Sequence, residues 1–334
     1  MTWNDVELIN VERIVRRYDG AVKLMRFPEN VHKSFGTKAN RYPLVAAEAS
    51  TGCEIRFVGN DADIVVSAGN LGGYAEVYRG DFLYATEYIN EGICKRLVLR
   101  IDNGVQKSDL SNTRKNYADN MWRVVFGGGI AAVIHDINPL SDIRPPHGDE
   151  APRKTLCAYG TSITQGAGTP LQSNSYLSVV GRNLSINVLN KGMGGSCFCE
   201  KEVGEYLADI DWDVLLLEPM GNMLSESYSA EMFENRLEYI VKCCVNNGKP
   251  IVIMSSYRFL GSPGHSREAF RVYNQAIINI CQKYKEQSLY FIDGSKIMND
   301  YTYLCADLIH PSGYGHSMIG LRLADKLKNE FKII

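Results

Sequence analysis

Four short segments in the second half of the sequence carry groups that together can perform nucleophilic catalysis. Ser162 stands in "TLCAYGTSITQG", and Asp307 and His310 stand three residues apart in "DLIHPSG". The segment "NKGMGGS" offers backbone N–H groups to an anion, and Asn222 in "EPMGNM" offers a side-chain amide. A serine hydroxyl needs a base that accepts its proton and donors that stabilise the developing oxyanion. The spacing of Asp307 and His310 lets the carboxylate fold back onto the imidazole Nδ1, which leaves Nε2 for Ser162.

Each segment also has a simpler interpretation. Serine and glycine end strands for local reasons, so Ser162 can be a turn residue, and Asn222 can be a turn former after its glycine. The glycines of "NKGMGGS" can serve only to provide positive φ angles. The chemistry therefore depends on whether the fold brings the four segments together.

The elements around these segments predict an open α/β sheet. Several of the apolar runs are apolar throughout, which is typical of strands covered on both faces. These runs are "TLCAYG", "INVLNKG", "DVLLLEPM", "PIVIMSSY" and "LYFIDG", and helical patterns alternate with them. Helices are predicted after the N-cap Ser229, from near Ser266, and from about Gly315 to Phe331. Five strands alternating with helices predict a parallel sheet with helices on both faces, whose strand ends bind ligands.

The first half has the short alternating strands of an all-β domain. We expect strands at "CEIRFVG", "RLVLRID", "MWRVVFGG" and "IAAVIHDI", and a hairpin in "YAEVYRGDFLYATEYI" that turns at Gly80–Asp81. This pattern predicts a sandwich or jelly roll. The segment "NPLSDIRPPHGDEAPRK", rich in proline and charge, is typical of a linker or strap. We therefore predict a β-sandwich domain at residues 1–145 and a catalytic domain at residues 146–334.

Composition narrows the class of protein. The chain has 334 residues, 45% of them hydrophobic and 22% charged, with a formal net charge of -2. This charge gives no basic surface for nucleic acid, and no apolar stretch approaches the twenty residues of a membrane span. The nine cysteines lack zinc-site spacing, so no metal site is expected. The N-terminal segment lacks the apolar run of a secretory signal, and together with reduced thiols this predicts a cytoplasmic protein.

The four segments resemble the sequence blocks of the SGNH hydrolase superfamily, also called GDSL-like esterases and lipases. They occur in the family's order, and each follows a strand or precedes a helix. The resemblance implies a three-layer α/β/α domain of flavodoxin-like type. It implies Ser162 as nucleophile, His310 as base and Asp307 as its partner. It also implies an oxyanion hole formed by the N–H of Ser162, the N–H of Gly195 (Gly194 is the neighbouring choice) and the amide of Asn222.

Two positions depart from the family pattern. Thr161 stands where the family carries Asp before the serine, and Met223 stands where Asp usually follows the asparagine. Neither position is the nucleophile, the base or a named oxyanion donor. These differences therefore bear on the subfamily and the substrate more than on the reaction.

The β-rich first half resembles the branch with an N-terminal jelly roll, which includes carbohydrate acetyl esterases. The implied function is hydrolysis of a short acyl ester, acetyl in particular, on a sugar, through an acyl-enzyme and without a cofactor. Arg258 and His265 lie in the loop after the fourth predicted strand, so they are candidates for substrate contact. The alternatives are a carbohydrate-binding protein with an inactive hydrolase domain, and a lipase or thioesterase of the same superfamily.

Overall fold

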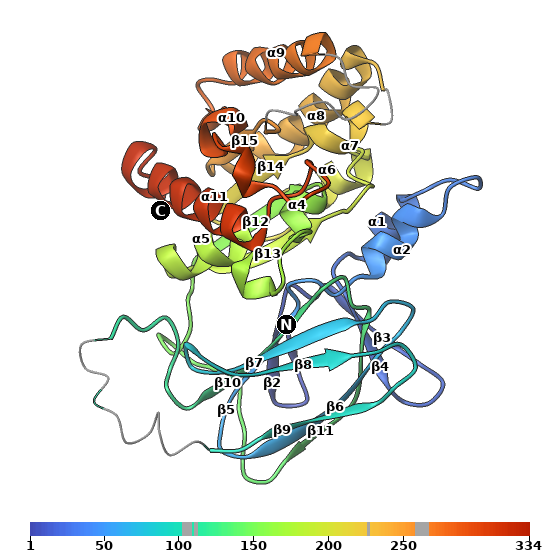
Figure 1. The fold of residues 1–334 in the computed structure, drawn as a ribbon, viewed down its shortest axis with the longest axis vertical. Coiled ribbons are helices and arrows are strands. Elements are labelled where there is room, and N and C mark those ends of the chain that lie inside the picture. Colours follow the sequence, from blue (N-terminus) through green and yellow to red (C-terminus); the bar gives the residue numbers. More distant parts are fainter. Residues whose placement is uncertain (102–108, 110–112, 226–227, 258–266) are drawn as a thin grey trace. The chain divides into compact units, whose positions relative to one another are not determined.

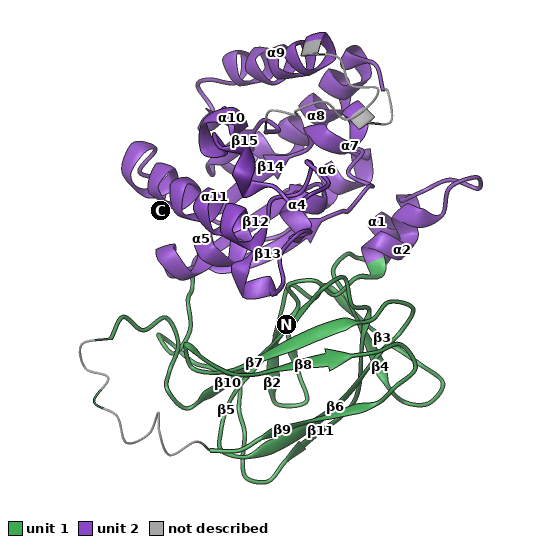
Figure 2. Ribbon diagram, viewed as in Figure 1, with its two compact units in different colours: residues 1–28, 48–153 green, residues 29–47, 154–334 purple. Residues whose placement is uncertain are grey.

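The chain divides into two compact units, each of which takes two separate stretches of the sequence (Figure 2). The structure is a computed structural model that describes residues 1–101, 109, 113–225, 228–257 and 267–334. Unit 1 comprises residues 1–28 and 48–153, and unit 2 comprises residues 29–47 and 154–334. The chain therefore passes from one unit to the other three times.

This division differs in two places from the predicted boundary after residue 145. The proline-rich segment stays with unit 1 because Glu150 is anchored there. Its carboxylate accepts two hydrogen bonds of 2.7 Å from Arg144, and its C=O accepts one of 2.8 Å from the N–H of Ala118. Residues 29–47 interrupt the β pattern of the first half and belong to unit 2. Loop-like composition shows where strands end, but it does not show which unit a loop packs on.

Unit 1 is a sandwich of two antiparallel sheets. The first has the order β1-β2-β5-β10-β7-β8, and the second has the order β3-β4-β11-β6-β9. The strands of the first sheet are β1 (Thr2–Trp3), β2 (Val6–Ile9), β5 (Glu54–Val58), β10 (Met121–Gly127), β7 (Gly73–Arg79) and β8 (Phe82–Ile89). Those of the second are β3 (Arg13–Arg16), β4 (Val22–Met25), β11 (Ala132–Pro139), β6 (Ala62–Ala68) and β9 (Lys95–Leu99). Apolar residues of both sheets, such as Phe57 and Ile64, form one buried core.

The strands that the sequence predicted are present in this sandwich. The predicted hairpin is β7–β8, and its turn begins at Gly80 with a φ of 58°, a region that favours glycine. The first four strands and β6 received no prediction, and the first four are only two to four residues long. Strands of that length are too short for a period of two to stand out.

Unit 2 contains a five-stranded parallel sheet (Figure 1). Its strand order is β13-β12-β14-β15-β16, which is order 2-1-3-4-5 within the unit and confirms the flavodoxin-like prediction. The strands are β12 (Thr155–Gly160), β13 (Asn187–Gly192), β14 (Val214–Glu218), β15 (Ile251–Met254) and β16 (Leu289–Ile292). The order reverses between β12 and β14, and at such a point the crevice beyond the carboxyl ends of the strands binds ligands.

Helices surround this sheet. The helices in the described part of unit 2 are α1 (Glu29–Ser34), α2 (Tyr42–Glu48), α4 (Ser162–Gln165), α5 (Tyr176–Leu184), α6 (Lys201–Asp209), α7 (Met220–Ser225), α8 (Ala230–Cys244), α9 (Arg267–Lys283), α10 (Gly294–Ile297) and α11 (Gly313–Asp325). Helix α5 packs on α11, while α6 packs on α8, and α8 on α9 (Figure 1). Ser229 caps α8 as predicted, since its side chain accepts a hydrogen bond from the N–H of Met232. None of the helices in the described part of the chain has the length and apolar character needed to cross a bilayer.

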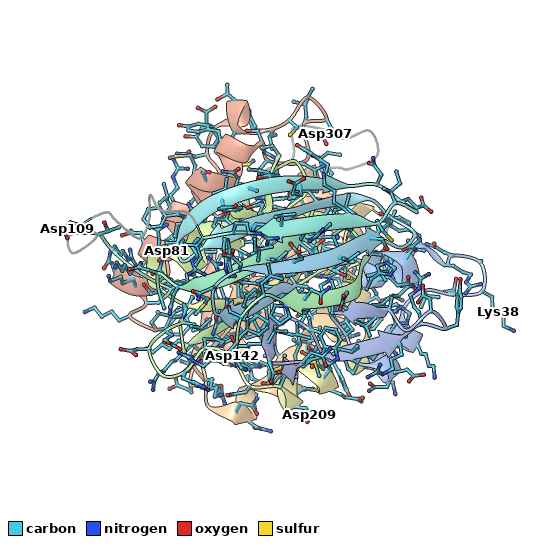
Figure 3. All side chains as sticks on the ribbon, turned by 90° about the horizontal axis from the view of Figure 1, so that it is seen from below. Lys38, Asp81, Asp109, Asp142, Asp209 and Asp307 are labelled. Carbon is cyan, nitrogen blue, oxygen red and sulfur yellow. The ribbon has the colours of Figure 1, made fainter. Side chains whose placement is uncertain are left out.

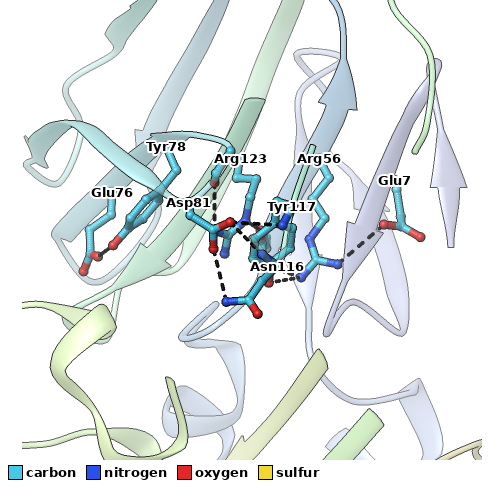
Figure 4. A network of polar contacts seen from close by, with 10 residues as sticks. Glu7, Arg56, Glu76, Tyr78, Asp81, Asn116, Tyr117 and Arg123 are labelled. Carbon is cyan, nitrogen blue, oxygen red and sulfur yellow. Dashed lines mark hydrogen bonds and ion pairs between the residues drawn. The ribbon is translucent and has the colours of Figure 1, made fainter. Parts of the chain in front are cut away.

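A buried charge network lies in the first sheet of unit 1 (Figure 4). Arg56 on β5 and Arg123 on β10 are directly opposite each other in the strand register. Glu54 lies between the two guanidinium groups and accepts hydrogen bonds of 2.8 Å from Arg56 and 2.5 Å from Arg123. Tyr117 covers the pair, with its ring centroid 3.6 Å from the Arg123 guanidinium carbon. Two like charges opposite each other destabilise a sheet, so the Glu54 carboxylate is what makes this pairing stable.

We expect replacement of Glu54 with glutamine to lower the free energy of unfolding by about 3 kcal/mol at pH 7, because two buried arginines lose the counterion that they share. Arg56 then keeps only the longer ion pair with Glu7, at 3.7 Å. Burial acts to raise the pKa of Glu54, but Arg123 and Arg56 outweigh it and lower that pKa to about 2. The native state thus keeps the carboxylate ionised at pH values where the unfolded chain protonates it. The stabilisation is present above about pH 4.5 and is lost as the pH falls toward 2.

Urea unfolding of wild type and Glu54→Gln at pH 7 and pH 3 measures this difference. The control is Glu87→Gln, which removes the partner of Lys95 in an ion pair that is more than one-third exposed on both sides. Such a pair contributes about 0–1 kcal/mol. Equal losses in the two variants, or a Glu54→Gln loss that grows at pH 3, would contradict the assignment.

Candidate active site

The turn that carries Ser162 joins β12 to α4. Ser162 is the first residue of α4, and Thr161 is its N-cap, whose hydroxyl accepts a 3.3 Å hydrogen bond from the N–H of Ile163. Gly160 precedes this cap in a space where a Cβ atom would lie 2.3 Å from the hydroxyl of Thr164. Only glycine fits there, so the strand can end directly beneath the helix. The half-buried Ser162 is thereby held at the carboxyl edge of the sheet.

His310 and Asp307 meet Ser162 at this edge. The Oγ of Ser162 lies 2.8 Å from Nε2 of His310, and Nδ1 of His310 lies 2.7 Å from Oδ2 of Asp307. With Asp307 as the acceptor at Nδ1, the proton of neutral imidazole sits on Nδ1, and Nε2 can accept a proton from the serine. Ser162 and His310 are 148 positions apart in the chain. The fold thus brings the serine, histidine and aspartate segments together in the order that a serine nucleophile requires.

Asp307 folds back over a strained backbone. Leu308 has a φ of 57°, a left-handed conformation that costs a non-glycine residue roughly 1–2 kcal/mol. The bend lets Oδ1 of Asp307 accept hydrogen bonds from the N–H groups of Ile309 (2.9 Å) and His310 (3.0 Å). Burial acts to raise the pKa of Asp307, but the hydrogen bonds from His310 and from these N–H groups outweigh it and lower that pKa. Asp307, labelled in Figure 3, has a side chain that is 45% exposed. The carboxyl is ionised at neutral pH.

The glycine loop after β13 lies against the serine turn. A Cβ atom on Gly194 would lie 3.6 Å from Cβ of Ser162, and the N–H of Gly194 donates a 2.8 Å hydrogen bond to Oε1 of Gln165. Gly195 has a φ of 63°, and within the described residues its N–H makes no hydrogen bond. The predicted glycine, Gly195, and its neighbour Gly194 therefore differ in structure. Gly194 binds α4, while the N–H of Gly195 has no acceptor in that part of the chain.

Asn222 on α7 is oriented by the same loop. Its Oδ1 accepts a 3.0 Å hydrogen bond from the N–H of Cys197. This contact defines which end of the amide is oxygen, so Nδ2 points away from Cys197 and can act as a donor. The strand order places β13, β12 and β14 next to one another, so Gly195, Ser162 and Asn222 follow three adjacent strands.

Two further residues at this site were not predicted, because neither lies in a sequence pattern that indicates a function. Tyr42 on α2 is 57% exposed, and its ring lies 3.1 Å from the place of a Cβ on Gly195. Glu218 ends β14 with a fully buried carboxyl. Tyr42 lies in a segment without a clear period, and Glu218 is a single charge at the end of an apolar run. Neither position could be recognised before the fold was known.

One further histidine and the two predicted substrate contacts lie apart from this arrangement. His316 is buried and structural: Nδ1 lies 3.2 Å from the N–H of Tyr176 and Nε2 lies 2.9 Å from the C=O of Ala167. Burial lowers the pKa of His316 to about 4, so it is neutral at pH 7. Arg258 and His265, predicted to contact substrate, lie outside the described residues. Among the residues described, no three His, Cys, Asp or Glu side chains gather in a way that could hold a metal ion.

Known proteins are similar to this chain in family and in fold. A sequence model of the GDSL-like Lipase/Acylhydrolase family matches residues 153–330. No match was found among curated proteins. The salicylyl-acyltransferase SsfX3 from a tetracycline biosynthetic pathway is similar in fold, with 12% identity, a TM-score of 0.78, and coverage of 95% of this chain and 93% of that one.

Two esterase structures are also similar. One is a family two carbohydrate esterase from Clostridium thermocellum in complex with cellohexaose, with 13% identity, a TM-score of 0.63, and coverage of 86% of this chain and 94% of that one. The other is an acetyl xylan esterase from the rumen bacterium Butyrivibrio proteoclasticus, with 12% identity, a TM-score of 0.64, and coverage of 100% and 98%. At these identities the likeness concerns the fold. The ordered sequence blocks, the fold and the family match together place this chain in the GDSL-like lipase/acylhydrolase family of carboxylic ester hydrolases.

Proposed function

We propose that this protein is a serine esterase that removes a short acyl group, acetyl in particular, from a carbohydrate through an acyl-enzyme on Ser162. The observation that carries the proposal is the continuous contact from Ser162 Oγ through His310 to Asp307, at 2.8 and 2.7 Å. A purely structural role of Ser162 in a turn does not explain why His310 lies at this distance or why Asp307 binds the other side of the imidazole. The single test is whether a fluorophosphonate labels Ser162 and whether that label abolishes hydrolysis of p-nitrophenyl acetate.

The reaction follows from the positions of these groups. Ser162 Oγ attacks the acyl carbonyl while His310 Nε2 takes its proton, and Asp307 stabilises the imidazolium that forms. His310 then gives this proton to the leaving sugar oxygen as the tetrahedral intermediate collapses to the acyl-enzyme. A water molecule next loses a proton to Nε2 and attacks the acyl carbon, and the proton returns to Ser162 as the carboxylic acid leaves.

The oxyanion is bound in this proposal by three donors, the N–H groups of Ser162 and Gly195 and the Nδ2 amide of Asn222. Gly195 is preferred over Gly194 because the Gly194 N–H already donates to Gln165. The bond from Cys197 holds the Asn222 amide in the orientation that a donor needs. Preset donors of this kind act most strongly on the charge that appears in the transition state.

The sugar part of the proposal is supported by Tyr42 and by the named activities of the similar structures. The exposed Tyr42 ring, next to Gly195, offers an apolar face and a hydroxyl to the leaving group of an ester bound at Ser162. An acetylated oligosaccharide has apolar C–H faces and hydroxyls that match such a ring. A methyl ester of acetic acid has neither.

We expect Tyr42→Ala to raise KM about three- to tenfold for an acetylated xylo-oligosaccharide and to leave KM for methyl acetate unchanged. Tyr42→Phe is the matched control because it keeps the ring and loses only the hydroxyl. Steady-state kinetics on both esters measures the effect. An equal rise in KM for the two esters would show that Tyr42 does not recognise the sugar.

The alternatives make different predictions. A carbohydrate-binding protein with an inactive hydrolase domain would bind an oligosaccharide but neither react with a fluorophosphonate nor release acetate. A lipase would prefer p-nitrophenyl esters of long acyl chains to the acetate, and a thioesterase would prefer an acyl thioester. A panel of these substrates separates the four possibilities.

A further inference from the structure

The buried carboxyl of Glu218 holds the nucleophile turn on both sides of Ser162. Glu218 pairs with Gly160 in the register of β14 and β12. Its Oε2 accepts hydrogen bonds from the N–H of Thr161 (3.1 Å), the hydroxyl of Thr161 (2.6 Å) and the hydroxyl of Thr164 (3.1 Å). Thr161 directly precedes Ser162, and Thr164 follows two residues later. One carboxyl oxygen therefore binds the first turn of α4 at both of its ends.

The two threonines extend this support into the surrounding structure. The Thr161 hydroxyl donates to Glu218 and accepts from the N–H of Ile163, so the carboxyl fixes the cap of α4. The Thr164 hydroxyl lies 2.9 Å from the hydroxyl of Tyr176 on α5. The turn is thereby tied to the strand beneath it and to the helix beside it.

Among the described residues, the environment of Glu218 shows no cation that would compensate a charge. Its hydrogen bonds in the described residues come from Thr161 and Thr164, and none comes from a lysine or an arginine. Its Oε1 and the Ser256 hydroxyl have no hydrogen-bond partner in that part of the chain. Burial raises the pKa of Glu218 to about 7 against the opposing effect of the threonine hydrogen bonds. A neutral amide should therefore replace this carboxyl without leaving a charge unpaired.

We propose that Glu218 is a positioning residue, which acts through Thr161 and Thr164 to hold the Ser162 hydroxyl and backbone N–H where they meet the substrate carbonyl. Thr161 replaces the aspartate usual before the nucleophile in the family, and here a carboxyl reaches the turn from the neighbouring strand instead. The inference rests on the proposed role of Ser162. Since a displacement of about 1 Å at a reacting group can cost up to a hundredfold in rate, the anchor has a measurable effect on chemistry.

The test compares Glu218→Leu, Glu218→Gln and wild type. Three quantities are measured: the rate of Ser162 labelling by a fluorophosphonate, kcat and KM for p-nitrophenyl acetate, and the melting temperature. We expect Glu218→Leu to slow labelling and kcat by about ten- to a hundredfold with KM little changed. Glu218→Gln keeps an acceptor for the threonines and should stay within about threefold of wild type. This rescue by the isosteric amide is not expected if Glu218 acts through its charge.

Glu200→Leu is the matched control. Glu200 is also a glutamate of unit 2 whose pKa burial raises to about 7, but its partner is the Tyr159 hydroxyl at 3.4 Å and not the serine turn. Its leucine variant should lower the melting temperature while Ser162 labelling keeps its wild-type rate. Slower labelling in both leucine variants, in proportion to their lost stability, would overturn the positioning role.

Thr164→Val keeps the inference testable if Glu218→Leu does not fold. It removes the hydroxyl that contacts both Glu218 and Tyr176, and we expect several-fold slower labelling of Ser162. A folded Glu218→Leu or Thr164→Val that labels as fast as wild type overturns the inference and leaves the esterase intact. Failure of wild type itself to label at Ser162 is a separate result, which overturns the proposed function.

Discussion

Replacing Ser162 with alanine is expected to remove almost all ester hydrolysis, with a loss in kcat of roughly a millionfold. The loss is this large because no other hydroxyl meets His310 Nε2 in the described structure, where Ser162 Oγ lies 2.8 Å away. The residual rate should come from oxyanion binding and substrate orientation alone. Initial rates with p-nitrophenyl acetate at high enzyme concentration measure the loss, and mass spectrometry of the fluorophosphonate adduct locates the label.

The control for this variant is Ser317→Ala. Ser317 lies on α11, where its hydroxyl donates a 2.9 Å hydrogen bond to the C=O of Gly313, so it takes no part in the proposed reaction. This variant should keep wild-type kcat and the label on Ser162. Two outcomes would contradict the assignment of Ser162 as nucleophile. One is a label on another serine of the wild-type protein, and the other is substantial turnover by Ser162→Ala.

Replacing Asn222 with aspartate is expected to lower kcat by roughly a hundred- to a thousandfold with KM little changed. Aspartate keeps an oxygen to accept the hydrogen bond from Cys197, which measures 3.0 Å in the wild type, so the loop should hold its shape. The variant loses both Nδ2 hydrogens and brings a negative charge to the place where the oxyanion develops. Because that charge appears in the transition state, the effect falls on kcat and not on substrate binding.

Asn222→Ala separates the catalytic and structural roles of this side chain. It loses the donor and also the anchor for Cys197, so both kcat and the melting temperature should fall. If Asn222 is only a turn former, Asn222→Asp stays active and Asn222→Ala loses only stability. Assaying kcat and melting temperature for both variants therefore distinguishes the two roles. A nearly wild-type kcat in Asn222→Asp would leave Ser162 and Gly195 as the remaining proposed oxyanion donors.

Much of this arrangement could be predicted because strand ends are marked in the sequence. The apolar runs before Ser162, Gly195 and Asn222 predict strands buried on both faces, and a parallel sheet brings their carboxyl ends to one edge. The pair Asp307 and His310 was recognisable because three residues suffice for the carboxylate to fold back. Local sequence patterns were thus sufficient to predict the main candidate catalytic residues, although they contain no information on long-range packing.

The remaining features depend on contacts that no local pattern records. Gly194 and Gly195 are two adjacent glycines in the sequence. Their N–H groups differ because the N–H of Gly194 donates a hydrogen bond to the side chain of Gln165, which lies 29 positions earlier. Glu218 meets Thr161 across 57 positions, so its role could not be inferred from the apolar run that it ends. Tyr42 lies in a part of the chain that the sequence assigned to the β domain, whereas the structure places it with unit 2.

The placement of residues 29–47 in unit 2 has a consequence for biosynthesis. Helix α1 packs against α6, which begins at Lys201, so these helices are synthesised far apart in time. At usual rates of translation the ribosome needs roughly 10 to 30 s to make the residues between them, 35–200. During that interval α1, whose Val31 is fully buried in the finished structure, lacks the helix on which it packs. The nascent chain thus carries an apolar segment that a chaperone can recognise until the second half of the protein has emerged.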